Sequence, residues 1–260
     1  MRPHVVADVG NSRVKWGLCA PDGSRVAEAV SLADDPDAWR EQLDLWAPRL
    51  AGGRPPLWVL ASVRPERSER LRDWLLGQGH RVAVLSRADQ LPLTVALERP
   101  DHVGIDRLLD AVAAKSRLPG GRPAVLVDAG SAVTVDWLDE AHVFRGGSIF
   151  PGLRLMAEAL HAYTALLPLV TVAEPVPPLP GSDTRRAMQA GIFHAVAGGI
   201  ERIARQLAAQ SSVAPQVFLT GGEAGLLHAA LGMPVVLWPE QTLEGILHTA
   251  EALPDDTLSA

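Results

Sequence analysis

Val5-Val6-Ala7-Asp8-Val9-Gly10-Asn11-Ser12 and Val125-Leu126-Val127-Asp128-Ala129-Gly130-Ser131-Ala132 are two copies of one short signature. In each copy an apolar run ends in Asp-x-Gly, and a serine follows one or two residues later. Each copy predicts a buried strand that delivers a carboxylate and then turns sharply at glycine. Two such turns facing each other could hold the phosphates of a nucleotide and its metal ion. The repeat therefore suggests an ATP-using enzyme with two related halves.

The composition is that of an ordinary globular chain. Its 260 residues suffice for one large or two modest domains, and 47% hydrophobic with 21% charged residues is typical. The net charge of −6 argues against a nucleic-acid-binding surface, which normally has a basic face. One cysteine, Cys19, rules out an intrachain disulfide framework and fits a reducing compartment. Because neither a signal peptide nor a membrane-length apolar stretch is evident, we expect a cytoplasmic protein without membrane contact.

Hydrophobic periodicity predicts a similar order of elements in both halves. The first half is expected to have strands at 4–9, 14–19, 25–30, 57–61 and 82–85, and helices at 35–50 and 65–77. The second is expected to have strands at 124–128, 133–138, 143–149, 217–220 and 234–238, and helices at 151–166, 184–209 and 224–231. A helix at about 103–117 would join the halves, and residues 252–260 would be a loose tail. We therefore predict an N-terminal domain at 1–115 and a C-terminal domain at 116–260.

The first turn has the residue types that a phosphate site needs. Glycine lets backbone N–H groups approach phosphate oxygens that a side chain would otherwise block. Asp8 could hold a hydrated magnesium ion, Asn11 and Ser12 could donate to phosphate, and Lys15 could add positive charge. A capped β-hairpin explains one such motif equally well, but two copies after two apolar strands favour phosphate binding.

Three further segments carry candidate chemistry. Ser131 in the second turn could contact phosphate, and Gly221-Gly222-Glu223 could support a base and ribose or simply cap a helix. Gly104-Ile105-Asp106-Arg107 could place a general base beside an anion-binding group. A helix-terminal charge with a surface arginine is the alternative for that segment. The sequence lacks the P-loop, the dinucleotide-binding glycine motif, the nucleophile elbow and any zinc-ligand spacing.

The order of these motifs resembles that of type III pantothenate kinases. It runs Asp-x-Gly-Asn-Ser, Gly-x-Asp-Arg, Asp-x-Gly-Ser-Ala, Gly-Gly-x-Ile-x-Pro-Gly and Asp-Thr-x-x-Ala-Met-x-x-Gly, from Asp8 to Gly222. The resemblance implies an α/β fold of the actin/hexokinase/Hsp70-like superfamily, with two duplicated ribonuclease-H-like domains around a nucleotide cleft. It also implies a transferase that phosphorylates pantothenate with ATP, the first step of coenzyme A biosynthesis.

The resemblance also implies roles for individual residues. Asp106 would be the catalytic proton acceptor, and Asp128 would bind a monovalent cation, K⁺ or NH₄⁺. Pantothenate would be bound by Gly104, Ile105, Asp106, Arg107 and Thr184. ATP would be bound by Asp8, Val9, Gly10, Asn11, Ser12, Arg13, Val14, Lys15 and Ser131, with Mg²⁺ held by Asp8 through water. A homodimer is expected, with the substrate pockets near the subunit interface.

Two positions depart from the family pattern, and two other functions stay open. Ser131 replaces the usual threonine but keeps the hydroxyl, whereas Leu97 stands where the family often has tyrosine. Some relatives were first described as accessory transcription regulators, so a catalytically idle relative is one alternative. A kinase of the same superfamily acting on another hydroxyl compound is the second. Intact Asp8, Asp106 and Asp128 favour an active enzyme.

Overall fold

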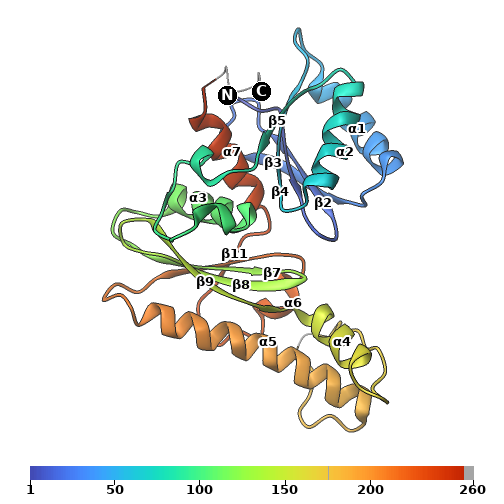
Figure 1. Cartoon of the computed structure of the whole chain (residues 1–260), viewed down its shortest axis with the longest axis vertical. Coiled ribbons are helices and arrows are strands. Elements are labelled where there is room, and N and C mark those ends of the chain that lie inside the picture. Colours follow the sequence, from blue (N-terminus) through green and yellow to red (C-terminus); the bar gives the residue numbers. More distant parts are fainter. Residues whose placement is uncertain (175, 255–260) are drawn as a thin grey trace. The chain divides into compact units, whose positions relative to one another are not determined.

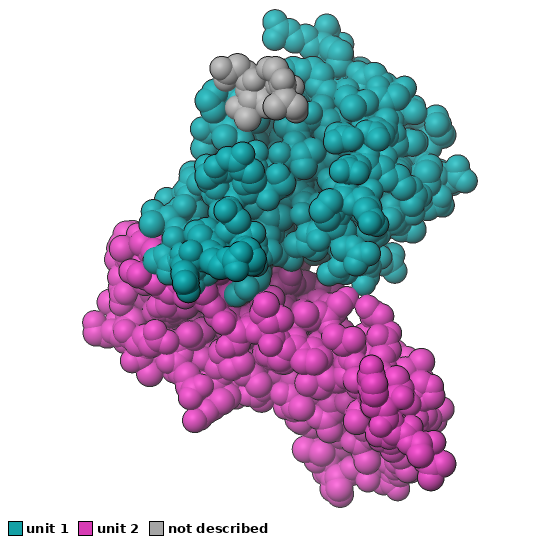
Figure 2. All heavy atoms as spheres, in the orientation of Figure 1, with its two compact units in different colours: residues 1–117, 240–260 teal, residues 118–239 magenta. Residues whose placement is uncertain are grey.

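The computed structural model describes residues 1–174 and 176–254, which form two compact units (Figures 1 and 2). Unit 1 contains Met1–Arg117 together with the segment from Glu240 to Pro254. Unit 2 contains Leu118–Pro239. The first boundary lies close to the predicted one near residue 115, but the chain returns to unit 1 at its end. Among the described residues no helix has the length and apolar character needed to cross a membrane.

Unit 1 is a mixed sheet with helices on both faces. Its elements are β1 (Val5–Val9), β2 (Val14–Cys19), β3 (Val26–Leu32), α1 (Pro36–Leu50), β4 (Leu57–Ser62), α2 (Pro65–Gly77), β5 (Arg81–Leu85), β6 (Thr94–Val95), α3 (Ile105–Arg117) and α7 (Gln241–Ala252). The sheet order is β3-β2-β1-β4-β5. β1 runs antiparallel to β2 and parallel to β4, so the carboxyl ends of β1 and β4 lie at the same end of the sheet.

Tryptophans fill the core of unit 1 on one face of the sheet. Trp16 and Trp58 from the sheet, and Trp39 and Trp46 from α1, are fully buried. The rings of Trp16 and Trp58 meet edge to face, with their centroids 4.8 Å apart. Burying one large side chain contributes roughly 1.5–3 kcal/mol, so this cluster supplies much of the stability of the unit.

Unit 2 repeats the same topology. Its elements are β7 (Ala124–Ala129), β8 (Ala132–Leu138), β9 (Val143–Pro151), α4 (Leu153–Ala162), α5 (Thr184–Ala208), β10 (Gln216–Thr220), α6 (Ala224–His228) and β11 (Val236–Leu237). Its strands follow the order β9-β8-β7-β10-β11, with β7 antiparallel to β8 and parallel to β10. Position by position this matches unit 1, which confirms the predicted α/β fold with two ribonuclease-H-like halves.

One local prediction was wrong, and one helix was not predicted. Pro151 is the last residue of β9, paired with Ala132, and not the first residue of a helix; α4 begins only at Leu153 after Gly152. Helix α7 was not predicted at all. Most residues of this helix are buried, polar ones such as Gln241, Thr242 and Glu244 included, so its burial does not follow from the spacing of apolar residues. It packs against α3 in unit 1, although the sequence prediction assigned residues 116–260 to the second domain.

Cys19 closes β2 inside unit 1. Cys19 is only 8% exposed and forms no disulfide. Burial raises the pKa of the Cys19 thiol to about 12, and the charge of Glu251 adds to this effect. The thiol is therefore protonated at neutral pH and chemically inert.

Candidate active site

The first turn joins β1 to β2 at one end of the unit 1 sheet. The strand register places Asp8 directly opposite Lys15, and the Gly10 N–H donates to the Arg13 carbonyl over 3.1 Å. Asn11 and the two residues after it are exposed. A carboxylate and an ammonium thus flank a turn of exposed residues, and its role in binding phosphate stays a prediction.

Arg67 of α2 holds this turn from behind. Its Nη1 donates to the carbonyl oxygens of Gly10 and Asn11, over 2.6 Å in each case. Its Nε donates to Asp34 Oδ2 over 2.6 Å. This contact was not predicted, because Arg67 and Gly10 are 57 positions apart and no motif links them.

Gly104-Ile105-Asp106-Arg107 forms the start of α3. Asp106 Oδ1 accepts the backbone N–H of Arg107 over 2.8 Å. A Cβ at position 104 would lie 2.5 Å from the same oxygen, so only glycine leaves room for this carboxylate. Burial raises the pKa of Asp106 above its ordinary value, against the smaller opposing effects of the Arg107 N–H and charge. The segment therefore presents a desolvated carboxylate beside a cation.

The Gly104 segment lies near the carboxyl ends of β1 and β4. A Cβ at position 104 would lie 3.6 Å from the Val63 side chain, and Val63 directly follows β4. The preceding residue, Ser62, donates its hydroxyl to the carbonyl of Val9 at the end of β1 over 2.9 Å. Ligands of open α/β sheets bind at the carboxyl ends of parallel strands. Asp106 and the first turn thus both lie near the carboxyl ends of β1 and β4, where a substrate is expected.

The second turn is also a hairpin, but it is one residue shorter than the first. Asp128 lies opposite Thr134, and the Gly130 N–H donates to the Ala132 carbonyl over 3.1 Å. Behind the turn runs Gly221, which follows β10 with φ +100°. A Cβ on Gly221 would lie 2.4 Å from both the Ala129 carbonyl oxygen and Asp128 Oδ1. Backbone packs directly on backbone here.

Glu223 links the second turn to helix α4. Its N–H donates to the carbonyl of Ala129 over 2.8 Å, and its carboxylate accepts the N–H groups of Leu153 (2.9 Å) and Arg154 (3.3 Å). Burial raises the pKa of Glu223 despite these hydrogen bonds. The Arg154 guanidinium in turn donates to Ser131 Oγ over 3.2 Å. The structure therefore brings Ser131 and the Gly221-Gly222-Glu223 segment together, and it adds Arg154, which the sequence prediction missed.

Thr184 lies apart from these residues. It is the exposed first residue of α5, where the Asp183 carboxylate accepts the Arg186 N–H over 2.9 Å. Within unit 2, the start of α5 lies beside α4 (Figure 1). In the described part of the chain no hydrogen bond joins Thr184 to the second turn, so its role in pantothenate binding stays a prediction.

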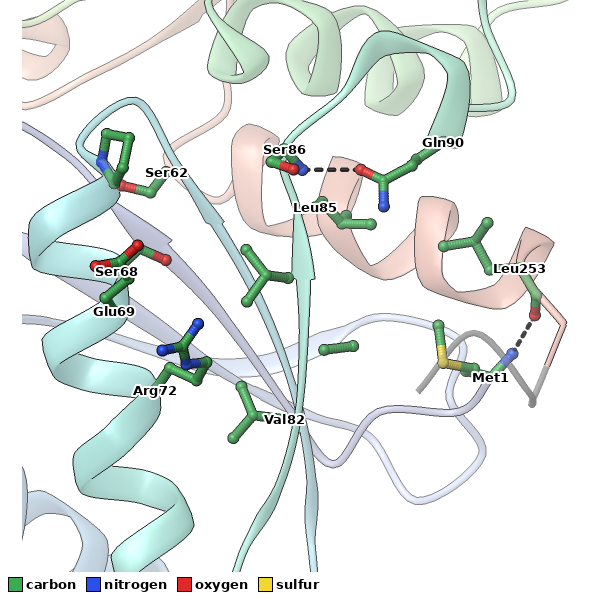
Figure 3. A pocket seen from close by; sticks show the side chains of 13 residues that line it. Met1, Ser62, Ser68, Glu69, Arg72, Val82, Leu85, Ser86, Gln90 and Leu253 are labelled. Atoms are coloured by element: carbon green, nitrogen blue, oxygen red, sulfur yellow. Dashed lines mark hydrogen bonds between the residues drawn. The ribbon is translucent and has the colours of Figure 1, made fainter. Parts of the chain in front are cut away.

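A separate groove runs along the edge of the unit 1 sheet (Figure 3). Its volume is about 430 Å³, and α2 and β5 supply most of its lining. Ser68 in its wall is 4% exposed, and its hydroxyl has no partner among the described residues. Neither Asp106 nor any residue of the first turn lines this groove. This groove is therefore not where the predicted chemistry lies.

The carboxylates fit a magnesium ion that is held mainly by phosphate. Across residues 1–174 and 176–254, no group of three or more His, Cys, Asp or Glu is arranged to hold a metal ion. Mg²⁺ in nucleotide sites usually needs only one or two carboxylates, with phosphate oxygens and waters completing its shell. Asp8, the next-to-last residue of β1, is a carboxylate that fits such a role.

Comparisons with known proteins identify the family. A sequence model of one family, type III pantothenate kinase, matches residues 4–206. This chain belongs to the type III pantothenate kinase family. The type III pantothenate kinase of Alkalilimnicola ehrlichii is 34% identical, with 95% of this chain and 98% of that protein covered. The type III pantothenate kinase of Moorella thermoacetica is 36% identical, with 92% and 95% covered.

Solved structures agree on the fold. A Campylobacter jejuni protein described as a Baf family transcriptional activator is similar with a TM-score of 0.61 at 17% identity, covering 95% of this chain and 98% of that one. The activator of 2-hydroxyisocaproyl-CoA dehydratase from Clostridium difficile, solved with bound ADPNP, has a TM-score of 0.53 at 12% identity, covering 97% and 94%. At such identities the likeness concerns the fold alone, so the assignment to the type III pantothenate kinases rests on the sequence relatives.

Proposed function

We propose that this chain transfers the γ-phosphoryl group of ATP to the 4′-hydroxyl of pantothenate, the first step of coenzyme A biosynthesis. Family membership supports the reaction. The observation that carries the assignment of roles is Asp106, a desolvated carboxylate with a raised pKa at the start of α3. A general base works best when its pKa lies closer to the working pH than that of an ordinary aspartate.

Asp106 acts as the proton acceptor in this proposal. The 4′-oxygen of pantothenate forms a bond to the γ-phosphorus, and the bond between that phosphorus and the β,γ-bridging oxygen breaks. The hydroxyl proton passes to the Asp106 carboxylate, while the leaving oxygen stays with ADP. The Arg107 N–H on Oδ1 fixes the carboxylate, and the Arg107 side chain adds a positive charge for the carboxylate of pantothenate. Phosphoryl transfer depends mainly on positioning and charge, so few side chains need to react.

The two turns contact ATP in this proposal. Backbone N–H groups of residues 10–12 and the Lys15 ammonium bind phosphate oxygens, and Asp8 holds Mg²⁺ through water. Ser131 is a further ATP contact, beside the Arg154 guanidinium. Asp128 holds the monovalent cation, which supplies positive charge near the phosphates. The close approach of the Gly221 backbone supports this role, because it fixes the Asp128 carboxylate in place.

The active form is proposed to be a homodimer. Around the ends of α4 and α5, Tyr163 is 90% exposed, Leu166 92% and Leu169 52%. Arg185, next to Thr184, donates to the Leu169 carbonyl over 3.3 Å, so Thr184 belongs to the same surface. Large apolar side chains gathered at one surface commonly mark an interface. In this proposal Thr184 lies at the subunit interface, near which the substrate pockets are expected.

The activity is tested with purified protein, Mg-ATP and pantothenate, in K⁺, NH₄⁺ or Na⁺ buffer. We expect ADP release that requires pantothenate and is strongest with K⁺ or NH₄⁺. ADP release with another alcohol but not with pantothenate would favour a different kinase of the superfamily. Tight ATP binding without turnover of any alcohol would favour an idle regulatory relative.

Asp106→Asn tests the assignment of the base. We expect kcat to fall about 10²–10⁴-fold, the usual contribution of general-base catalysis. The matched control is Asp101→Asn, an exposed carboxylate five positions earlier, which should leave kcat unchanged. Near-normal turnover in the Asp106 variant would remove Asp106 from this role.

A further inference from the structure

The peptide groups of the first turn are oriented by one side chain. Arg67 Nη1 binds the carbonyl oxygens of Gly10 and Asn11, both at 2.6 Å. In a planar trans peptide the C=O and the following N–H point in opposite directions. Fixing these two carbonyls toward Arg67 therefore turns the N–H groups of Asn11 and Ser12 to the opposite side of the turn. Adjacent N–H groups aimed the same way form an anion-binding concavity.

The ion pair between Arg67 and Asp34 fixes the position of the Arg67 guanidinium. The side chains of Arg67 and Asp34 are only 17% and 18% exposed, and the Nε–Oδ2 distance is 2.6 Å. The other oxygen of this carboxylate, Asp34 Oδ1, is buried with no hydrogen-bond partner in the described structure. A buried ion pair with an unsatisfied oxygen is a poor source of stability. We therefore explain this ion pair by its effect on Arg67, which it holds in place to bind the two carbonyl oxygens of the turn.

The planar guanidinium of arginine can bind the Asp34 carboxylate and the two carbonyls of the turn at the same time. Its guanidinium presents five N–H donors in a rigid plane, so one edge can bind the carboxylate while another binds two carbonyls. A lysine ammonium is a point charge on a flexible stem and cannot hold the same geometry. Because Arg67 contacts carbonyl oxygens on the rear of the turn, it acts through the backbone and not as a phosphate ligand.

We propose that Arg67, oriented by Asp34, is a positioning residue that pre-forms the phosphate-binding backbone of the first turn. This inference rests on the proposed function in that it takes ATP as the ligand of the turn. Removing the guanidinium leaves the carbonyls of Gly10 and Asn11 free to rotate, and ATP binding must then order the turn. Ordering a loop on binding weakens affinity without changing the chemical step.

Arg67→Ala, Arg67→Lys and the matched control Arg70→Ala test the proposal. Arg70 lies one turn further along α2, and its side chain is 50% exposed. It donates to the Asp34 backbone carbonyl over 3.2 Å and lies 3.8 Å from Asp34 Oδ2, but in the described structure no hydrogen bond joins it to the first turn. We measure the Kd for Mg-ATP by calorimetry, then KM for ATP, kcat and Tm. Arg67→Ala should raise Kd and KM at least tenfold, with kcat within about threefold of wild type. The Kd and KM of Arg67→Lys should lie between those of wild type and Arg67→Ala. Arg70→Ala should stay within twofold in Kd.

Each outcome decides the proposal. A folded Arg67→Ala protein that binds ATP within twofold of wild type would overturn it, as would an equal loss in Arg70→Ala. If Arg67→Ala does not fold, Arg67→Lys decides, and wild-type affinity in that variant would overturn it. A wild-type protein that fails to bind Mg-ATP overturns both this inference and the proposed function. ATP binding without phosphorylation of pantothenate overturns the proposed substrate alone, and the measured Kd values still decide the role of Arg67.

Discussion

The first and second turns occupy equivalent places in equivalent sheets, yet they are held in different ways. Arg67 holds the first turn through a side chain that binds two carbonyls. The second turn is held by backbone, because Gly221 passes so close to Ala129 that no Cβ fits between them. A duplicated fold therefore conserves the position of a functional turn without conserving what supports it. The two supports should fail under different substitutions.

Gly221→Ala should have the largest effect on folding. A Cβ there would lie 2.4 Å from backbone and carboxylate oxygens, and φ +100° is strained for any residue with a side chain. We expect a loss of about 3 kcal/mol in the free energy of unfolding, measured by urea denaturation. The control is Gly222→Ala, where nothing lies within 4 Å of the new Cβ. Equal stability of the two variants would mean that backbone packing does not hold the second turn.

Gly10→Ala should separate stability from ligand binding in the first turn. A Cβ at Gly10 meets only the Arg13 carbonyl oxygen, at 3.3 Å, and the φ of Gly10 lies outside the left-handed region. The free energy of unfolding should change by less than about 1 kcal/mol. KM for ATP should nevertheless rise about tenfold, because the methyl group blocks the approach of phosphate to backbone N–H groups. An unchanged KM would argue against phosphate binding at this glycine.

Asp106→Asn should stabilise unit 1 while it reduces turnover. Because burial raises the folded-state pKa of Asp106, the ionised carboxylate disfavours folding at neutral pH. We expect the variant to melt a few degrees above wild type at pH 7, measured by calorimetry. The difference should shrink as the pH falls toward the ordinary aspartate pKa, below which both proteins carry a neutral group. In wild type, kcat/KM should fall on the acid side of its pH profile, and this fall should occur at a higher pH than for an aspartate with an ordinary pKa.

Glu223→Gln should give the smallest change, a difference in the pH dependence of the stability of unit 2. Burial raises the pKa of Glu223, so the folded state binds a proton more readily than the unfolded state. The stability of wild type relative to the Gln variant should therefore rise as the pH falls from 7 toward the ordinary glutamate pKa and level off below it. Thermal melts between pH 4 and 8 would show this trend, and Glu41→Gln, at an exposed position of α1, is the control. The opposite slope would mean that the hydrogen bonds from Leu153 and Arg154 outweigh burial.

The sequence was sufficient for whatever is local and repeated. Both Asp-x-Gly turns, their flanking strands and most helices have patterns that depend only on neighbouring residues, and the structure confirms them. Helix α7 was missed because it is buried on nearly every side. Pro151 was misplaced because its pairing with Ala132 in the sheet outweighs the preference of proline for a helix start.

The supports of the candidate site could not be predicted for a different reason. Arg67 and Glu223 contact segments 57 and 70 positions away, respectively, and chain folding alone brings these pairs together. A lone arginine on a helix or a glutamate after two glycines has many possible partners. The sequence therefore points to the residues that face a ligand more readily than to those that hold them in place.

The inert thiol of Cys19 makes the chain convenient for site-specific labelling. Its side chain is buried and its pKa is about 12, so thiol reagents at pH 7–8 should leave the folded protein unmodified. A cysteine introduced on the exposed surface of each unit would then be the reactive pair without prior removal of the native one. Spin labels or fluorophores at two such positions would report the distance between the units as ATP and pantothenate are added.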